Sequence, residues 1–186
     1  MSSTRVFILG ALETDGPMHG YQLRVLATNS HLHNWTDITP GAIYGALKRL
    51  IAEGLAREVR TERDGARPER QIVEITDAGR AEVRKLRLQA LTGFRLSPDP
   101  FDLAFARPGP ELIGELPAIL RTRRDEIAAA ARDYDDRTER LASELSPLES
   151  LTMRHRLLRL RAEIAFLEHA MSQLSATPKK EHHTQL

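Results

Sequence analysis

A short segment of the chain, residues 38–55 (ITPGAIYGALKRLIAEGL), combines residue types that suit contact with nucleic acid. Its apolar residues recur at helical spacing, which predicts a short amphipathic helix with one buried side. The other side carries two glycines, Gly41 and Gly45, beside Tyr44, Lys48 and Arg49. Each glycine inside a helix costs about 0.5–1 kcal/mol relative to alanine. A helix that gives up this stability on its exposed side is suited to close approach by a duplex.

The start of this helix has its own chemistry. We expect Thr39 to be the N-cap and Pro40 to take the first helical position, where the missing proline N–H would have no partner in any case. A helix N-terminus attracts phosphate, so Thr39 has a second role as a phosphate contact. Gly54 is expected where the helix ends.

The surrounding elements must position this helix. Two earlier helices are expected over residues 4–12 and 19–28, followed by a polar loop over 29–37. After the third helix, strands are expected over 55–60 and 71–75, joined by a charged loop around Asp64 and Gly65. Thr76 is expected to cap a helix that ends near residue 92. This order predicts a mainly α fold with a small β-wing, the winged helix-turn-helix, whose third helix lies in the DNA major groove.

The residues expected to contact DNA lie on the third helix, at the start of the second helix and in the loop between the strands. They are Tyr21, Gln22, Thr39, Pro40, Gly41, Ala42, Tyr44, Gly45, Lys48, Arg49, Arg63, Arg67 and Arg70. The small residues would allow close approach, and the arginines of the loop would enter a minor groove or hold the backbone. Two alternatives stay open: the loop arginines pair with neighbouring acids, and Arg49 pairs with Glu53.

The C-terminal half predicts long helices. Residues 93–110 form a proline-rich connector with a short helical piece near 101–106, and residues 111–175 form a helical dimerisation domain. In the last helix, apolar residues alternate in steps of three and four along a seam that must be buried. They are Leu157, Leu160, Ile164, Leu167, Met171 and Leu174. Either a second copy or the preceding helix of the same chain would cover them. The tail, 176–186, is expected to be disordered.

Three segments resemble a known family. "HGYQL" at 19–23, "ITPGAIYGALKRLIAEGL" at 38–55 and "VEITDAGRAEV" at 73–83 resemble the winged-helix half of PadR-type transcriptional regulators. The resemblance covers about residues 5–90, and we expect the DNA-binding domain over 1–92. Trp35 is similar to an aromatic position of the longer subfamily. The resemblance implies a homodimeric repressor that reads an inverted repeat and is released by a small, often aromatic ligand near the junction of its domains. Base preference does not carry over, because Gly45 stands where many relatives have proline or a charge.

The ligand candidates are the aromatic residues near that junction: Trp35, Phe94, Phe101 and Phe105. A core anchor is the alternative for Trp35, and the phenylalanines would otherwise pin the connector. The histidine pairs His31/His33 and His182/His183 lack a third ligand at suitable spacing, so we expect no metal.

Composition narrows the function further. The 186 residues carry a formal net charge of +1 and no cysteine, and apolar runs are short. We therefore expect a cytoplasmic protein without membrane spans, whose nucleic-acid site is local. No grouping of residues predicts catalysis or a cofactor, so an enzyme is not expected. The alternative to a DNA-binding repressor is a helical adaptor that uses its winged domain to bind protein.

Overall fold

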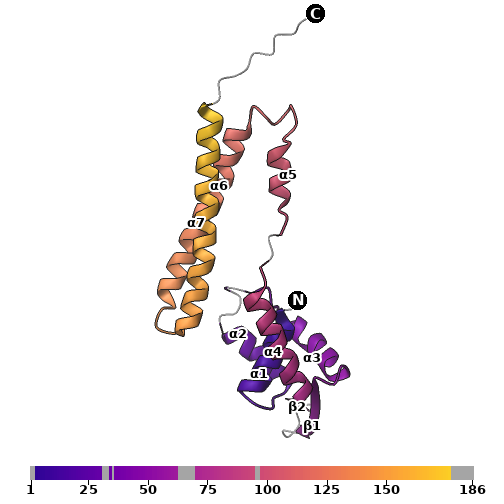
Figure 1. Ribbon diagram of the computed structural model, residues 1–186. Coiled ribbons are helices and arrows are strands. Elements are labelled where there is room, and N and C mark those ends of the chain that lie inside the picture. The colour runs from indigo at the N-terminus through magenta and orange to yellow at the C-terminus, as the bar shows by residue number, and fades with distance from the viewer. Residues whose placement is uncertain (1–2, 31–33, 35, 63–69, 95–96, 177–186) are drawn as a thin grey trace, which may run out of the picture. The chain divides into compact units, whose positions relative to one another are not determined.

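The computed structural model describes residues 3–30, 34, 36–62, 70–94 and 97–176, and Figure 1 shows its helices and strands. The chain divides into two units, Met1–Leu96 and Ser97–Leu186, which are described separately below. Across the described ranges, none of the helices has both the length and the apolar character that crossing a bilayer would require.

The first unit contains four helices and a two-stranded sheet within the ranges just given. In chain order they are α1 (Ser3–Thr14), α2 (Gly20–Asn29), α3 (Ala42–Ala52), β1 (Ala56–Glu62), β2 (Arg70–Ile75) and α4 (Asp77–Thr92). This order confirms the predicted winged helix-turn-helix.

One apolar core joins all the elements of the first unit. Side chains from all six elements meet there, including Ile8, Leu12, Leu23, Ile43, Leu50, Ala56, Val73 and Val83. Burial of a side chain of this kind stabilises a fold by about 1.5–3 kcal/mol. The core fixes one side of α3 and leaves its opposite side outward.

The wing is an antiparallel pair in which Ala56 lies opposite Ile75. The register shifts between Glu58 and Arg60, which marks a β-bulge. The turn before α2 adds an isolated β-bridge to the wing, because Met18 and Val73 exchange two backbone hydrogen bonds of 3.0 and 3.1 Å.

The turn from the wing into α4 depends on a glycine. Thr76 caps α4, as predicted, since its hydroxyl accepts a hydrogen bond from Gly79 N–H at 3.1 Å. The same hydroxyl donates to the carbonyl of Gly54, which has the left-handed backbone (φ +72°) predicted for the end of α3. A β-carbon at Gly79 would lie 2.0 Å from the Leu55 carbonyl oxygen, so this close packing excludes larger residues.

The prediction for the start of α3 is wrong in detail. The helix begins at Ala42 with Gly41 as N-cap, and no side chain caps it. Thr39 and Pro40 instead form a turn, closed by a 3.0 Å hydrogen bond from Ala42 N–H to the Thr39 carbonyl. A backbone bond thus replaces the expected hydroxyl cap, and Pro40 precedes the helix.

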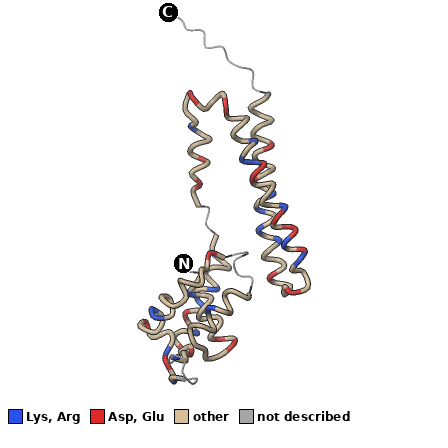
Figure 2. Tube along the Cα trace, turned by 180° about the vertical axis from the view of Figure 1, so that it is seen from behind, with Lys and Arg blue, Asp and Glu red and all other residues tan. Residues whose placement is uncertain are grey.

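The second unit contains α5 (Pro100–Ala106), α6 (Leu116–Arg140) and α7 (Pro147–Ala176). α6 and α7 lie side by side and antiparallel: Leu120 packs with Leu167 and Ala170 at one end, and Tyr134 donates a hydrogen bond to Met153 Sδ near the other. Charges of both signs run along the two helices (Figure 2). Some of them pair across the hairpin, as Arg123 does with Glu163 at 3.0 Å.

Candidate nucleic-acid interface

The exposed side of α3 contains the residues predicted to contact DNA. Ile43, Ala46, Leu47 and Leu50 are buried, whereas Gly41, Ala42, Tyr44, Gly45, Lys48 and Arg49 are exposed. The structure therefore brings the six exposed residues together on one helix face. Their role in DNA binding stays a prediction.

The two glycines of this face, Gly41 and Gly45, are not required by close packing against other described residues of the chain. A β-carbon at Gly41 would meet nothing within 4 Å, and one at Gly45 would meet only an Arg49 guanidinium nitrogen at 3.8 Å. Neither position has left-handed backbone. Because nothing in the fold requires glycine at Gly45, its absent side chain matters only to something that approaches from outside.

Tyr44 is held in place by the start of α2. Its side chain is 46% exposed, yet its ring covers Gly20. The ring is thus fixed on one side and open on the other, with its hydroxyl available at the edge of the α3 face.

Arg49 does not pair with Glu53 as the alternative proposed. Arg5 of α1 instead forms an ion pair with Glu53 at 2.5 Å and also lies 3.9 Å from Glu82 of α4. The hydrogen bond from Arg5 lowers the pKa of Glu53, with smaller help from the charges of Arg5 and Arg49. Arg49 itself stays exposed on the α3 face.

The start of α2 is a capping box that involves a residue missed from the sequence. His19 Nδ1 accepts the Gln22 N–H at 3.0 Å, and Gln22 Oε1 accepts the His19 N–H at 2.9 Å. The Gln22 side chain therefore serves the helix, although Gln22 was predicted to contact DNA. The spacing of a cap residue and glutamine three positions later was the available signal, but histidine is an uncommon cap.

Tyr21 lies at the opening of a small pocket that reaches the wing. Tyr21 is 47% exposed, and the guanidinium groups of Arg24 and Arg70 lie over its ring, at 5.1 and 5.8 Å from the ring centre. His19, Gly20, Tyr21, Tyr44, Arg70 and Gln71 line this pocket of about 230 Å³. The structure thus unites the start of α2, α3 and the wing. Arg63 and Arg67 lie outside the described residues.

Two of the four residues predicted for a ligand, Phe101 and Phe105, lie together in the second unit. Phe101 and Phe105 stack on each other, with ring centres 5.5 Å apart, and meet Phe166 of α7 edge-on. They belong to the packing of the second unit, which is the alternative given for them above. Phe94 lies in the first unit and is 90% exposed. Trp35, His31, His33, His182 and His183 lie outside the described residues.

The predicted seam of α7 faces α6 of the same chain. Leu157 and Leu167 are buried, and Met171 and Leu174 pack on the cluster around Leu120. Packing within the chain thus covers these four residues, which is the alternative given above, and the role of the seam in a dimer stays a prediction.

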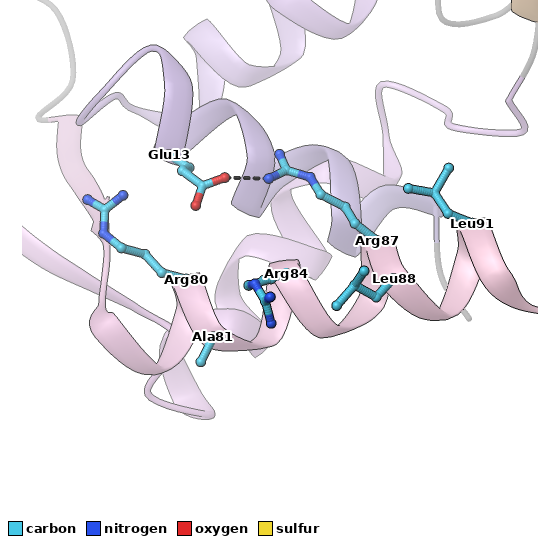
Figure 3. A pocket seen from close by; sticks show the side chains of 7 residues that line it. All are labelled: Glu13, Arg80, Ala81, Arg84, Arg87, Leu88 and Leu91. Atoms are coloured by element: carbon cyan, nitrogen blue, oxygen red, sulfur yellow. Dashed lines mark hydrogen bonds and ion pairs between the residues drawn. The ribbon is translucent and has the colours of Figure 1, made fainter.

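A basic groove runs along α4 in the first unit. It has a volume of about 490 Å³, and Figure 3 shows its lining, which is Glu13, Arg80, Ala81, Arg84, Arg87, Leu88 and Leu91. Glu13 of α1 binds Arg87 at 2.5 Å. Arginines thus dominate one end of the groove, and leucines the other.

Comparisons with known proteins agree with this geometry. Residues 8–85 match the model of the transcriptional regulator PadR-like family. No curated protein matches the chain in sequence.

Several solved structures share the fold. The Bacillus subtilis PadR in complex with operator DNA is 22% identical, with a TM-score of 0.65 over 94% of this chain and 98% of that one. The same protein in complex with p-coumaric acid is 19% identical, with a TM-score of 0.66 over 95% and 99%. A PadR-like transcriptional regulator from Bacillus cereus is 18% identical, with a TM-score of 0.62 over 94% and 99%. Residues 8–85 thus match the PadR-like family of transcriptional regulators in sequence, and the chain shares the fold of the solved PadR structures.

Proposed function

We propose that this regulator is a homodimeric repressor whose α3 helices read the two halves of an inverted repeat. The observation that carries the proposal is the α3 face, on which Gly45 has no role in the chain's own packing. A major groove is about 12 Å wide and admits a helix, most easily one without bulky outward side chains. Tyr44, Lys48 and Arg49 border the bare positions and supply a phenol and two cations.

A second copy is proposed to bind α7 on the side opposite α6. A second series of residues there recurs in steps of three and four, and all eight are exposed. They are Leu148, Leu151, His155, Leu158, Ala162, Ala165, His169 and Ser172. This series, the outer seam, contains no Asp, Glu, Lys or Arg, although charged residues flank it. An uncharged heptad stripe on a helix exposed to water is typical of a coiled-coil partner surface.

The residue sizes in the outer seam favour antiparallel pairing. If Leu158 lies opposite Ala162 of the partner subunit, a large side chain meets a clearly smaller one in three of the four kinds of layer. The other layers are then Leu148 with Ser172, Leu151 with His169, and His155 with Ala165. Interlocking large and small residues fills such an interface well. The flanking Arg154 then comes near Glu168 of the partner subunit, which adds two ion pairs per dimer.

The small-molecule effector is proposed to be an amphipathic anion that binds the groove along α4. Arg80 and Arg84 offer cations at one end, and Leu88 and Leu91 offer apolar surface at the other. A carboxylate on an aromatic or aliphatic body fits this division. The p-coumaric acid bound by the Bacillus subtilis protein belongs to that chemical class.

Selection of bound duplexes from a random pool tests the proposed function. We expect enrichment of an inverted repeat whose half-sites lie about 34 Å apart or a multiple of that distance. Affinity for the selected duplex should fall steeply with salt, because phosphate contacts release counterions. If no sequence is enriched above random DNA, the adaptor alternative is favoured instead.

A further inference from the structure

His19 has a proton on the nitrogen that faces the pocket. The side chain is only 8% exposed, and its Nδ1 accepts the Gln22 N–H at 3.0 Å. A nitrogen that accepts carries no hydrogen, and a neutral imidazole has one N–H. The proton of the neutral ring is therefore on Nε2.

This Nε2–H meets another donor. Arg70 Nη1 lies 3.3 Å from His19 Nε2, and a guanidinium can only donate hydrogen bonds. Two donors at this distance do not satisfy each other. Both groups border the same pocket, and none of its described lining residues is acidic. The described lining of the pocket thus presents a cation and a neutral donor side by side, without a carboxylate.

The position of the pocket indicates which acceptor. Tyr44 of the α3 face forms one wall, and Arg70 belongs to the wing. The start of α2 forms the floor, and helix N-termini favour anions. An anion in this pocket would lie directly beside a duplex held by α3.

We propose that His19 Nε2–H and the Arg70 guanidinium together bind one backbone phosphate of the operator DNA. This inference rests on the proposed DNA-binding function. It assigns His19 two tasks through its two nitrogens: Nδ1 caps α2, and Nε2 donates to the phosphate. The cap fixes the ring so that the donor is already aimed before DNA arrives.

Two variants of the full chain separate these tasks. His19→Asn keeps an oxygen that accepts the Gln22 N–H, since asparagine is a good N-cap, but it lacks the Nε2 donor. We expect its thermal unfolding to match the wild type and its affinity for the selected duplex to fall about tenfold. Arg70→Gln should lower affinity and also reduce the slope of log K against log salt by about 1. His19→Asn should leave that slope unchanged, because a neutral donor displaces no counterion.

Arg57→Gln is the matched control, because Arg57 lies on the same wing and is paired with Glu74 at 2.6 Å. It should retain wild-type affinity and salt slope. A wild-type affinity for His19→Asn would overturn the inference while leaving DNA binding intact. Failure of the wild-type chain to bind any selected duplex would instead overturn the proposed function.

A measurement without any variant covers the case in which His19→Asn does not fold. Long-range ¹H–¹⁵N spectra of the wild-type chain distinguish the two imidazole tautomers. We expect the Nε2–H form in the free chain, and a shift of its resonance when the selected duplex is added. The Nδ1–H form in the free chain, or no shift with duplex bound, would overturn the inference.

Discussion

The ring of Tyr44 covers Gly20 so closely that a β-carbon at Gly20 would lie 2.8 Å from Tyr44 Cε1. The glycine of the "HGYQL" segment therefore sets the position of a side chain on α3, the helix proposed to bind DNA, 24 residues later. This contact links two of the three sequence segments that resemble the family.

Gly20→Ala should displace the Tyr44 ring and lower affinity for the selected duplex by about 1–3 kcal/mol, as Tyr44→Ala should. Tyr44→Phe keeps the ring on Gly20 and loses only the hydroxyl, so it should lie between these variants and the wild type. Mobility-shift titration measures the affinities, and sedimentation checks that the dimer is unchanged. Full affinity in Gly20→Ala would show that the ring position does not matter.

Substitutions of Gly45 should preserve or raise the stability of the fold, and a bulky one should weaken DNA binding. Gly45→Ala should raise the free energy of unfolding by about 0.5–1 kcal/mol, because alanine is the better helix former and the added carbon meets only an Arg49 guanidinium nitrogen at 3.8 Å. Gly45→Leu adds a side chain to the face proposed to enter the groove and should weaken DNA binding while the helix stays stable. Denaturant titration and mobility shift report the two quantities. A Gly45→Leu chain that binds DNA normally would place the duplex elsewhere.

Disulfide trapping tests the outer seam cleanly, since the chain has no cysteine of its own. In the antiparallel arrangement, Leu148→Cys mixed with Ser172→Cys should give the crosslinked dimer under mild oxidation, and neither variant should crosslink alone. Parallel pairing would reverse this result. Leu158→Glu should yield monomers by sedimentation, whereas Leu103→Glu, an exposed position on α5, should not.

Titration of p-coumarate and octanoate by calorimetry tests the groove along α4. Arg84→Ala should weaken binding of a carboxylate by about tenfold, because it removes a charge-assisted hydrogen bond. Arg121→Ala, an exposed residue of α6, serves as the control. If neither compound binds the wild type, the groove is not an effector site of this class.

The pair of Arg5 and Glu53 should make stability depend on pH. The hydrogen bond from Arg5 lowers the pKa of Glu53 from its ordinary value of 4.5, so the pair stabilises the folded state above that value. The contribution is lost as the pH falls through the lowered pKa of the folded state. Thermal unfolding should therefore separate the wild type from Glu53→Ala at pH 7, and the difference should shrink towards pH 3. A difference independent of pH would contradict this ionic role.

Much of the first unit could be predicted because its signals are local. The apolar spacing of α3, the Thr76 cap and the positive φ at Gly54 each follow from a few neighbouring residues. The start of α3 was misplaced because a backbone turn bond competes with a threonine cap, and the sequence does not decide between them. The phosphate contact proposed for His19 also involves Arg70, which is 51 residues away in the sequence. No local sequence pattern indicates that these two residues lie close together.

The second unit shows a different limit. Periodicity identified one apolar seam on α7, but a seam does not indicate which helix covers it. Here α6 covers that seam. The outer seam of α7 was not predicted from the sequence, because alanine, histidine and serine interrupt its leucines.

The two backbone hydrogen bonds between Met18 and Val73 make the turn before α2 part of the wing. The base of the wing therefore cannot hinge away from α2 without breaking them, and α3 is tied to α2 through the shared core. We expect the first unit to bind and release DNA as a rigid body. In the proposed dimer, DNA binding would then be controlled by the distance between the two winged-helix units. An inducer need only change that distance so that it no longer equals one turn of the duplex.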